Sequence, residues 1–314
     1  THATIRHNVI RDNISRGRSD RCAGGLIYCD GTIEHNTIVE NSGNGGGLIY
    51  CNGLIQFNTI AGNSVESEYG GGGGLAYCDG IIQNNVIREN RAQRGAGLSG
   101  CGGTIQHNLI AGNRSVKTGG GLIRCQGGIF GNTIVGNIAG EGAGGVAECY
   151  GILRNNILWD NVAGTATIQL SETNPPDFCC IQDWETTGTN NLASDPMFVD
   201  AAAGDYRLQA GSPCIDAGMN FYWVGWPLCD LDGNVRLAGE RVDIGAYEFG
   251  ASIDSDGDML ADSEESVQGT DSMAEDTDGD GRRDGQEVLR GTDPLVVTTS
   301  ATFSIPDDFT SIQE

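Results

Sequence analysis

Two twelve-residue stretches near the C-terminus carry acidic residues at matching positions. DSDGDMLADSEE, residues 254–265, and DTDGDGRRDGQE, residues 276–287, both have acids at positions one, three, five, nine and twelve. Carboxylates this close repel one another without a cation, and a hard cation with about six to eight oxygen ligands suits such a loop. A solvated acidic linker would not repeat this spacing. We therefore expect about two calcium ions, with position seven of each loop offering its backbone carbonyl.

The same segment resembles the thrombospondin type 3 repeats of bacterial surface proteins, in which successive calcium loops join into a stiff rod. The trailing GTDS (269–272) and GTDP (291–294) fit this resemblance. Met259 departs from it, because the second loop has Gly281 at the matching position. By the resemblance, the ligands of the first ion are Asp254, Asp256, Asp258, the Leu260 carbonyl, Asp262 and Glu265, and those of the second are Asp276, Asp278, Asp280, the Arg282 carbonyl, Asp284 and Glu287.

Cysteine is the next residue type that could do chemistry, and it occurs at a fixed place in a repeat. GGLIYCDGTIEHNTIVEN, residues 24–41, is followed 22 residues later by GGLIYCNGLIQFNTIAGN. Self-similarity at a period of this size is typical of solenoid proteins. The series, with spacings of 22 to 27 residues, consists of Cys29, Cys51, Cys78, Cys101, Cys125 and Cys149.

Each cysteine begins the same frame of residues. Glycine follows after two residues, an aliphatic residue after four and after nine, and an asparagine after seven and after twelve. Residues 5–13 fit this frame too, which puts Thr1 at the cysteine position of a seventh unit. The two predicted asparagine ladders are Asn36, Asn58, Asn85, Asn108, Asn132 and Asn156, and Asn41, Asn63, Asn90, Asn113, Asn137 and Asn161.

Three short runs of β-type residues in each unit predict the fold. The runs LIYC, TIEHN and TIVEN are separated by glycine or asparagine and show no helical period, unlike a leucine-rich repeat. We therefore expect an all-β parallel β-helix with three short strands in each turn of 22 to 27 residues. Equivalent residues then lie about 4.8 Å apart, with isoleucines inside and asparagines at the bends.

The repeated cysteines are predicted to be buried free thiols. Metal and redox sites need two or more cysteines that converge, whereas these occur singly and without histidine at ligand spacing. Equivalent residues on neighbouring parallel strands point the same way, which is poor geometry for a disulfide. A small apolar ladder in the core is the interpretation that remains.

Side-chain alternation does not by itself show whether the leucines before each cysteine lie inside or outside the solenoid. It puts Cys29 on the face of Ile27, and it puts Leu26 on the face of Tyr28. Either a bend turns the leucines inward, or an apolar stripe lies outside and forms a partner surface. We expect the bend.

The strict repeat fades after Ala163, and several distinctive motifs follow its last unit. They are ILWDN (157–161), DPMFVD (195–200), GDYRLQAGSPCIDAG (204–218), DLDGNVR (230–236) and VDIGAYEF (242–249). In these the chain resembles bacterial exported right-handed parallel β-helix proteins that carry the C-terminal region named choice-of-anchor Q. The resemblance implies export and attachment to the cell envelope, and it implies no reaction, because the group is defined by architecture.

Two features of this region leave alternatives. The aromatic stretch NFYWVGWPLCD, residues 220–230, is either a sugar-binding platform or a hydrophobic plug over the last turn. We expect the plug, because the open end of a β-helix exposes strand edges that must be covered. A bridge between Cys214 and Cys229 would cross this plug. Adjacent Cys179 and Cys180 should point to opposite faces of a strand.

Composition and charge limit the kinds of binding partner that the protein can have. The chain of 314 residues has 50 glycines and a net charge of −24. Such an acidic protein has no electrostatic attraction to phosphate backbones or anionic lipid, which argues against nucleic acid as a partner. No apolar run approaches the length of about 18 residues that a membrane span needs.

The solenoid surface offers few residues for catalysis, although some β-helices are polysaccharide lyases or hydrolases. Arg124 and Glu148 stand in adjacent turns and are expected to form a surface ion pair. His35 and His107 share a column three turns apart, at about 14 Å, which is too far to act together. We expect no enzymatic activity. The row of tyrosines before the cysteines keeps a glycan-binding module as the alternative.

The sequence therefore predicts four regions. They are regular coils (1–164), irregular turns and a cap (165–250), a calcium segment (251–297), and a terminal strand or the start of another β-helix domain (298–314). The chain is expected to be a segment of a longer tandem protein, or else to be covered head to tail by a neighbour that would extend it into filaments. We expect a calcium-stiffened structural or adhesive protein, extracellular or at the cell surface.

Overall fold

The computed structural model describes residues 3–15, 23–67, 70–185, 188–220 and 229–297. The chain divides into two compact units, Thr1–Ala251 and Ser252–Glu314. Some sequence-based expectations fall on residues outside the described ranges. They concern Thr1, residues 221–228 of the aromatic stretch and the terminal region 298–314.

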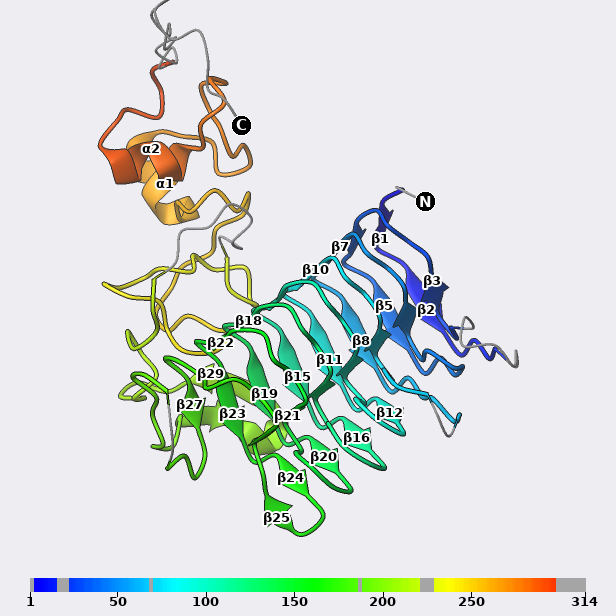
Figure 1. Cartoon of the computed structure of the whole chain (residues 1–314). Coiled ribbons are helices and arrows are strands. Elements are labelled where there is room, and N and C mark those ends of the chain that lie inside the picture. The colour runs from blue at the N-terminus through cyan, green and yellow to red at the C-terminus, as the bar shows by residue number, and fades with distance from the viewer. Residues whose placement is uncertain (1–2, 16–22, 68–69, 186–187, 221–228, 298–314) are drawn as a thin grey trace, which may run out of the picture. The chain divides into compact units, whose positions relative to one another are not determined.

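The first unit is a parallel β-solenoid of about seven turns, whose strands stack into long sheets (Figure 1). Sheet A contains β1 (Ile5–Arg6), β4 (Ile33–Glu34), β7 (Leu54–Gln56), β10 (Ile81–Gln83), β14 (Ile105–Gln106), β18 (Ile129–Phe130) and β22 (Leu153–Arg154). Sheet B contains β2 (Val9–Arg11), β5 (Thr37–Val39), β8 (Thr59–Ala61), β11 (Val86–Arg88), β15 (Leu109–Ala111), β19 (Thr133–Val135), β23 (Ile157–Trp159) and β27 (Cys180–Ile181). Sheet D contains β3 (Leu26–Ile27), β6 (Leu48–Ile49), β9 (Leu75–Ala76), β13 (Leu98–Ser99), β17 (Leu122–Ile123), β21 (Val146–Ala147) and β26 (Leu170–Ser171). The all-β solenoid predicted from the repeat is confirmed.

A fourth sheet departs from the predicted three strands per turn. Sheet C contains β12 (Arg91–Ala92), β16 (Arg114–Ser115), β20 (Ile138–Ala139), β24 (Val162–Ala163) and the antiparallel β25 (Ala166–Thr167). Each of its parallel strands begins directly after the second ladder asparagine of its turn. In earlier turns the same line continues as single parallel bridges from Ile14 through Ser42 and Ser64 to Arg91.

Register between turns is kept by identical residue types. Ile33 pairs with Ile55 in sheet A, and Ile38 pairs with Ile60 in sheet B. These interior isoleucines are fully buried. The repeat glycines allow equally close stacking elsewhere, because a Cβ on Gly53 would lie 2.0 Å from the carbonyl oxygen of Gly31 in the preceding turn.

Residues in the left-handed conformation form the corners of each turn. The column before the cysteines includes Tyr28, Tyr50 and Tyr77, with φ between 51° and 55°. The columns before the two asparagines behave likewise, as His35 (φ 53°) and Glu40 (φ 57°) illustrate. A left-handed residue between two extended segments breaks the alternation of side chains, so the leucine two residues before the corner can face the same way as the cysteine directly after it.

This corner explains the place of the leucines. Leu48, Leu75, Cys51 and Cys78 all belong to one core cluster and have no exposed surface. The expected inward bend is therefore confirmed. Among the repeated cysteines, those from Cys51 to Cys149 are buried, whereas Cys29 is half-buried.

Both predicted asparagine ladders are present. In the first, the side-chain amide of Asn58 donates to the carbonyls of Ile33 and Gln56 at 2.8 Å, and to Asn85 Oδ1 at 3.0 Å. The same Oδ1 also accepts the backbone N–H of Asn58 at 3.0 Å. Each asparagine thus satisfies backbone groups that the corner leaves without strand partners, and it links its turn to the next.

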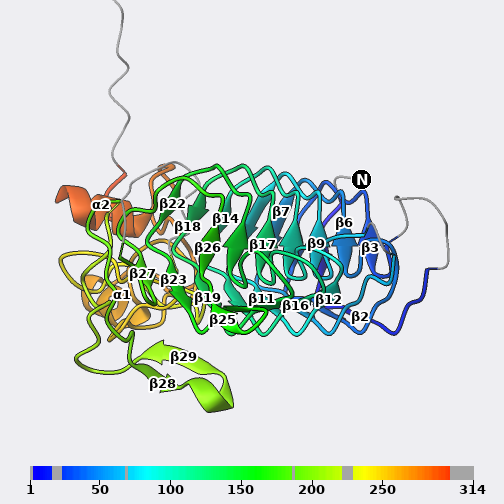
Figure 2. The same cartoon turned by 60° about the horizontal axis from the view of Figure 1, so that its bottom comes forward.

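The segment after β27 lies against the side of the solenoid, and we call residues 195–220 and 229–250 the cover. It contains β28 (Phe198–Asp200), the short 3₁₀ helix η1 (Ala201–Ala203) and β29 (Asp205–Leu208), which Figure 2 shows outside the stack of coils. Phe198, Tyr206 and Leu231 pack on the outer face of sheet B, against Leu109, Ala111 and Val135.

Hydrogen bonds anchor the cover along several turns. Asn84 Nδ2 donates to the Asp230 carbonyl at 2.6 Å, and Asn155 exchanges two bonds of 2.9 Å with the backbone of Met219. The described residues at both ends of the aromatic stretch therefore lie on the flank of the solenoid. The plug expected over the last turn concerns residues outside the described ranges.

The second unit contains two short helices, α1 (Asp262–Gln268) and α2 (Asp284–Arg290), each of which follows one acidic loop. Both helices end at a glycine in the left-handed conformation, Gly269 and Gly291. Positions nine and twelve of each loop thus belong to the first helical turn.

Candidate metal centre

Each acidic loop is wound around the carboxylate of its first aspartate. Asp254 accepts hydrogen bonds from the backbone N–H groups of Gly257 at 2.8 Å, Asp258 at 3.2 Å and Met259 at 3.1 Å. Asp276 does the same for Gly279 and Gly281 at 2.8 Å. The sequence folds locally in this way because aspartate readily accepts bonds from the backbone that follows it.

The two loops share the same backbone geometry despite their different sixth residues. Met259 and Gly281 both have a φ of 90°, and Gly257 and Gly279 both have a φ of 76°. The first loop thus holds a methionine in a conformation that favours glycine. The departure from the repeat pattern at Met259 therefore leaves the φ of the loop unchanged.

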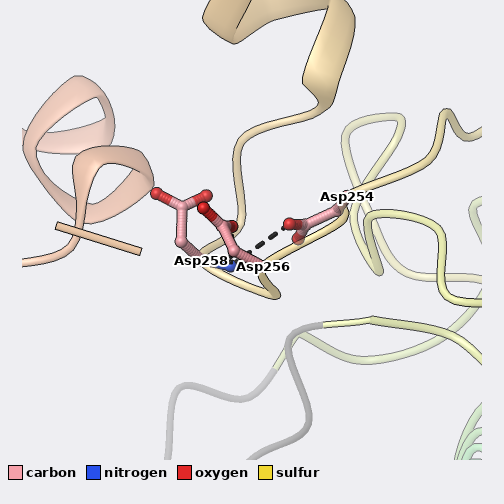
Figure 3. Close-up of side chains that lie close together, drawn as sticks. All are labelled: Asp254, Asp256 and Asp258. Carbon is pink, nitrogen blue, oxygen red and sulfur yellow. Dashed lines mark hydrogen bonds between the residues drawn. The ribbon is translucent and has the colours of Figure 1, made fainter. Parts of the chain in front are cut away.

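The first three aspartates of each loop form a compact group of oxygens. Ligand atoms of Asp254, Asp256 and Asp258 all lie within 4.8 Å of one another, and those of Asp276, Asp278 and Asp280 do so as well. Figure 3 shows the first group gathered on one loop, with the Asp258 amide bonded to Asp254. This separation suits a set of oxygens at about 2.3 to 2.6 Å from one calcium ion.

Four buried carboxylate oxygens have the arrangement expected of cation ligands. Among the described residues, Asp256 Oδ2, Glu265 Oε2, Asp278 Oδ2 and Glu287 Oε2 are buried and have no hydrogen-bond partner. They belong to positions three and twelve of both loops. Buried polar atoms are almost always paired, so the same exception at the same two positions fits a cation ligated there.

The other oxygen of each glutamate is held in place by the threonine that follows its helix. Thr270 Oγ1 donates to Glu265 Oε1 at 3.4 Å, and Thr292 Oγ1 donates to Glu287 Oε1 at 3.3 Å. These are the threonines of the GTDS and GTDP motifs. Each threonine therefore orients a predicted ligand while leaving its second oxygen unpaired.

Burial, followed by repulsion between the carboxylates, raises the pKa values of the loop carboxyls. Desolvation, followed by the charge of Asp254, raises the pKa of Asp256 to about 6. Desolvation, followed by the charges of Asp256 and Asp258, raises the pKa of Glu265 to about 7. The pKa of Glu287 is raised for the same kinds of reason. A divalent cation would relieve this repulsion.

Position nine has a different environment from the other predicted ligands. Asp262 accepts the backbone N–H of Ser255 at 2.8 Å and its hydroxyl at 2.7 Å. Asp284 accepts the same two groups of Thr277 at 2.9 and 2.6 Å. Both oxygens of each aspartate therefore close the loop, and their ligation of calcium stays a prediction, as does that of the Leu260 and Arg282 carbonyls.

Sequence reasoning missed the residues that support the ligands. Ser255 and Thr277 occupy position two of both loops, so their hydroxyl was a repeated signal that could have been used. Gly285 could not have been recognised in this way. Its N–H donates to Asp258 Oδ2 at 2.8 Å, and a Cβ there would lie 2.6 Å from the Asp258 carbonyl oxygen.

Comparison with known protein families found a match for this segment. Residues 254–273 and 276–296 match the bacterial TSP3 repeat. The match implies calcium binding and a structural role for these residues, in agreement with the two oxygen clusters. No curated protein matches the chain.

Outside the TSP3 segment, the solenoid surface was the other candidate site. Arg124 Nε lies 2.6 Å from Glu148 Oε2, so the expected ion pair is present. His35 stacks between His7 and Phe57, with ring centroids 5.2 and 5.1 Å away. His107 is fully buried, and desolvation, followed by the charge of Arg236, lowers its pKa. These groups are engaged in packing and pairing within the protein.

The tyrosine row is a stack of rings. Tyr28, Tyr50 and Tyr77 follow one another at 5.3 Å, with interplanar angles of 8° and 17°. A Cβ on Gly100 in the next turn would lie 2.7 Å from the Tyr77 ring. Sugars bind aromatic platforms through the ring face, and here the facing sides of the rings cover one another.

Proposed function

We propose that this protein is a non-catalytic structural or adhesive component of the extracellular or cell-surface space, in which a rigid β-solenoid is joined to a calcium-stiffened TSP3 segment. The observation that carries this proposal is the pair of unpartnered oxygens at positions three and twelve of both loops. TSP3 repeats are typical of extracellular proteins. Among the described residues, no helix has the length and apolar character needed to span a bilayer.

Calcium titration calorimetry tests the proposal at the level of the ions. We expect about two ions per chain, and loss of one of them in Glu265→Gln. Glu264→Gln is the matched control, because Glu264 neighbours Glu265 on α1 but is exposed. A protein that takes up no calcium, or a Glu265→Gln variant that binds like the control, would contradict the assignment.

The solenoid supports a structural role over a catalytic or glycan-binding one. Arg124 and Glu148, at the corners of adjacent turns, neutralise one another, and the tyrosine rings are stacked on themselves. Incubation of the calcium-loaded protein with acidic polysaccharides should therefore give no unsaturated product. A glycan array should show no specific ligand, and a positive result in either assay would replace the structural proposal.

The proposal includes head-to-tail association of solenoids. Strands β1, β2 and β3 stand at the ends of sheets A, B and D. A neighbouring solenoid could pair with these edges in register and continue the ladders. Sedimentation velocity should then show concentration-dependent association, and a single monomeric species at all concentrations would rule out this mode of assembly.

A further inference from the structure

Cys180 lies at the boundary between the last coil and the cover. In β27, Ile181 pairs with Leu158 and belongs to the solenoid core. The preceding residue, Cys179, also faces that core, where its sulfur accepts the Asn156 backbone N–H at 3.4 Å. Cys180 belongs instead to a second cluster, on the outer side of sheet B. The two adjacent cysteines thus face opposite sides, as expected, yet both are fully buried.

The cover brings Cys214 to the same cluster from the other side. Its carbonyl accepts the Ile244 N–H at 3.0 Å, and the next residue, Gly245, donates to the Asn155 carbonyl at 2.8 Å. A Cβ on Gly245 would lie 2.7 Å from Ile157 Cδ1, and Ile157 is the residue with which Cys180 pairs in sheet B. Cys180 and Cys214 thus belong to one buried cluster, in which the Cys180 thiol donates to the Ser194 carbonyl at 3.2 Å.

This pair differs from the repeated cysteines of the coils. Cys51 and Cys78 project in parallel from equivalent positions of adjacent turns. Parallel side chains about 4.8 Å apart are too far apart at Cβ for an unstrained disulfide. Cys180 and Cys214 instead enter one cluster from two layers that pack against each other, which is the arrangement in which two side chains can converge.

We propose that Cys180 and Cys214 form a disulfide that fastens the cover to the last turn of the solenoid. This pairing replaces the bridge between Cys214 and Cys229 expected from the sequence. Cys229 lies beside Asn84, next to β11, whereas Cys214 lies in the cluster of Cys180 in β27, four strands further along sheet B. The cross-link would close a loop of about 35 residues, a size at which a disulfide stabilises a protein appreciably.

Formation of this bond requires an external disulfide, such as oxidised glutathione or a thiol–disulfide oxidoreductase. One cysteine thiolate attacks a sulfur of the oxidant, forms a mixed disulfide and expels the first small thiolate. The thiolate of the other cysteine then attacks the protein sulfur of the mixed disulfide and expels the second. Two protein thiols lose two electrons and two protons, and one small disulfide gains them as two thiols.

Burial dictates when the bond can form. In the docked cover both thiols are shielded, and the hydrogen bond with Cys214, followed by burial, raises the pKa of Cys180 well above its ordinary value. A protonated, covered thiol is a poor nucleophile. The exchange therefore takes place during folding, before the cover closes over the outer face of sheet B.

Oxidative refolding tests the proposal on the full chain. The protein is unfolded, refolded with a mixture of reduced and oxidised glutathione, alkylated and digested for mass spectrometry. We expect one cross-linked peptide pair that contains Cys180 and Cys214, with two hydrogens fewer than the separate peptides. The oxidised protein should melt about 10 °C above protein refolded with a reductant.

Variants distinguish this bond from other pairings. Cys180→Ala and Cys214→Ala should each abolish the difference in melting temperature between the oxidised and reduced proteins, whereas Cys229→Ala should keep it. Recovery of both wild-type residues as alkylated thiols, or of Cys214 joined to Cys229, would overturn the proposal. The peptide map of the wild-type chain gives this answer even if an alanine variant fails to fold.

Discussion

Single residues in unusual backbone conformations set the geometry of both units. Three columns of left-handed residues turn the coils, and most of their positions are filled by residues other than glycine. Met259 is the corresponding case in the calcium loops, because it adopts the φ of 90° that Gly281 has in the second loop. A side chain in this region costs about 1 kcal/mol or more relative to glycine.

Replacing Met259 by glycine should therefore strengthen the first loop. We expect Met259→Gly to stabilise the folded second unit by about 1 kcal/mol, since the strain of the side chain at positive φ is removed. Chemical denaturation in saturating calcium measures this change. The reverse variant, Gly281→Met, should destabilise the second loop by a similar amount, and equal effects of opposite sign are the pattern to look for.

Protonation of the loop carboxylates should weaken calcium binding. Without the ion, the pKa of Glu265 is raised from 4.5 to about 7 and that of Asp256 from 3.8 to about 6, so the folded unit binds protons more tightly than the unfolded chain. The ion-free unit should therefore lose stability as the pH rises from about 4 to about 7.

The calcium-bound unit should behave in the opposite way, because the ion displaces these protons. Calcium affinity should fall as the pH is lowered through about 7 and then about 6. Calorimetry at about pH 8 and about pH 5.5, in buffers of equal ionic strength, measures the change. Affinity that is independent of pH would show that these carboxyls are not ligands.

At the scale of the elements, the asparagine ladders connect one turn to the next. Asn108 donates to the carbonyls of Ile82 and Gln106 at 2.9 Å and to Asn132 Oδ1 at 3.0 Å, and its Oδ1 accepts from Asn85. All of these groups are buried. Removing one amide therefore leaves several backbone groups without partners at once.

Asn108→Ala should consequently be among the most destabilising substitutions in the solenoid. We expect a loss of about 3 to 5 kcal/mol in the free energy of unfolding, measured by urea denaturation. Asn8→Ala is the matched control, since Asn8 stands in the same ladder but is exposed. The control should cost about 1 kcal/mol or less, and similar losses in the two variants would argue against burial as the cause.

The repeat made most of the solenoid predictable, because each column of isoleucine or asparagine is sampled six or more times. The fourth sheet was not predicted, since its strands are two residues long and begin with residues as different as Arg91 and Val162. The sequence predicted irregular turns and a cap at 165–250, and it did not indicate where the cover would lie. Its position depends on contacts such as Asn84 with Asp230, which join residues 146 positions apart and leave no periodic signal.

On the scale of the whole molecule, the two units are stabilised by different forces. The first unit has a continuous apolar core and hydrogen-bonded ladders. Among the described residues of the second unit, four acidic side chains are fully buried, namely those of Asp258, Glu265, Asp284 and Glu287. Its helices α1 and α2 have only seven residues each. Short helices around buried acids are marginal in water without a counter-ion.

Removal of calcium should therefore affect the units unequally. Hydrogen exchange should accelerate in residues 254–287 on addition of EDTA, while the strands of sheet B keep their protection. At a free calcium concentration of 100 times the dissociation constant, each ion stabilises the folded unit by about 2.7 kcal/mol. Scanning calorimetry should show the corresponding shift, and an unchanged profile with EDTA would count against calcium.

The oxygen clusters of the acidic loops were predictable for the same reason as the solenoid, because the loop occurs twice. The spacing of Asp256 and Glu265 matches that of Asp278 and Glu287, and the structure leaves one buried oxygen unpaired in each of the four. The spacing alone did not distinguish position nine from the other predicted calcium ligands. In the structure position nine differs from them, because the hydroxyl and amide of Ser255 donate hydrogen bonds to both oxygens of Asp262.

The anchors of the cover have a consequence for how such a protein changes length over evolution. Its hydrogen bonds to the coils fall on Asn84, Thr133 and Asn155, and the nearly identical units around Cys29 and Cys51 lie before the first of them. Tandem duplication of a unit there would insert one rung of about 4.8 Å without moving the cover relative to the turns that hold it. Solenoid length can therefore vary at the N-terminal side while the C-terminal architecture is inherited unchanged.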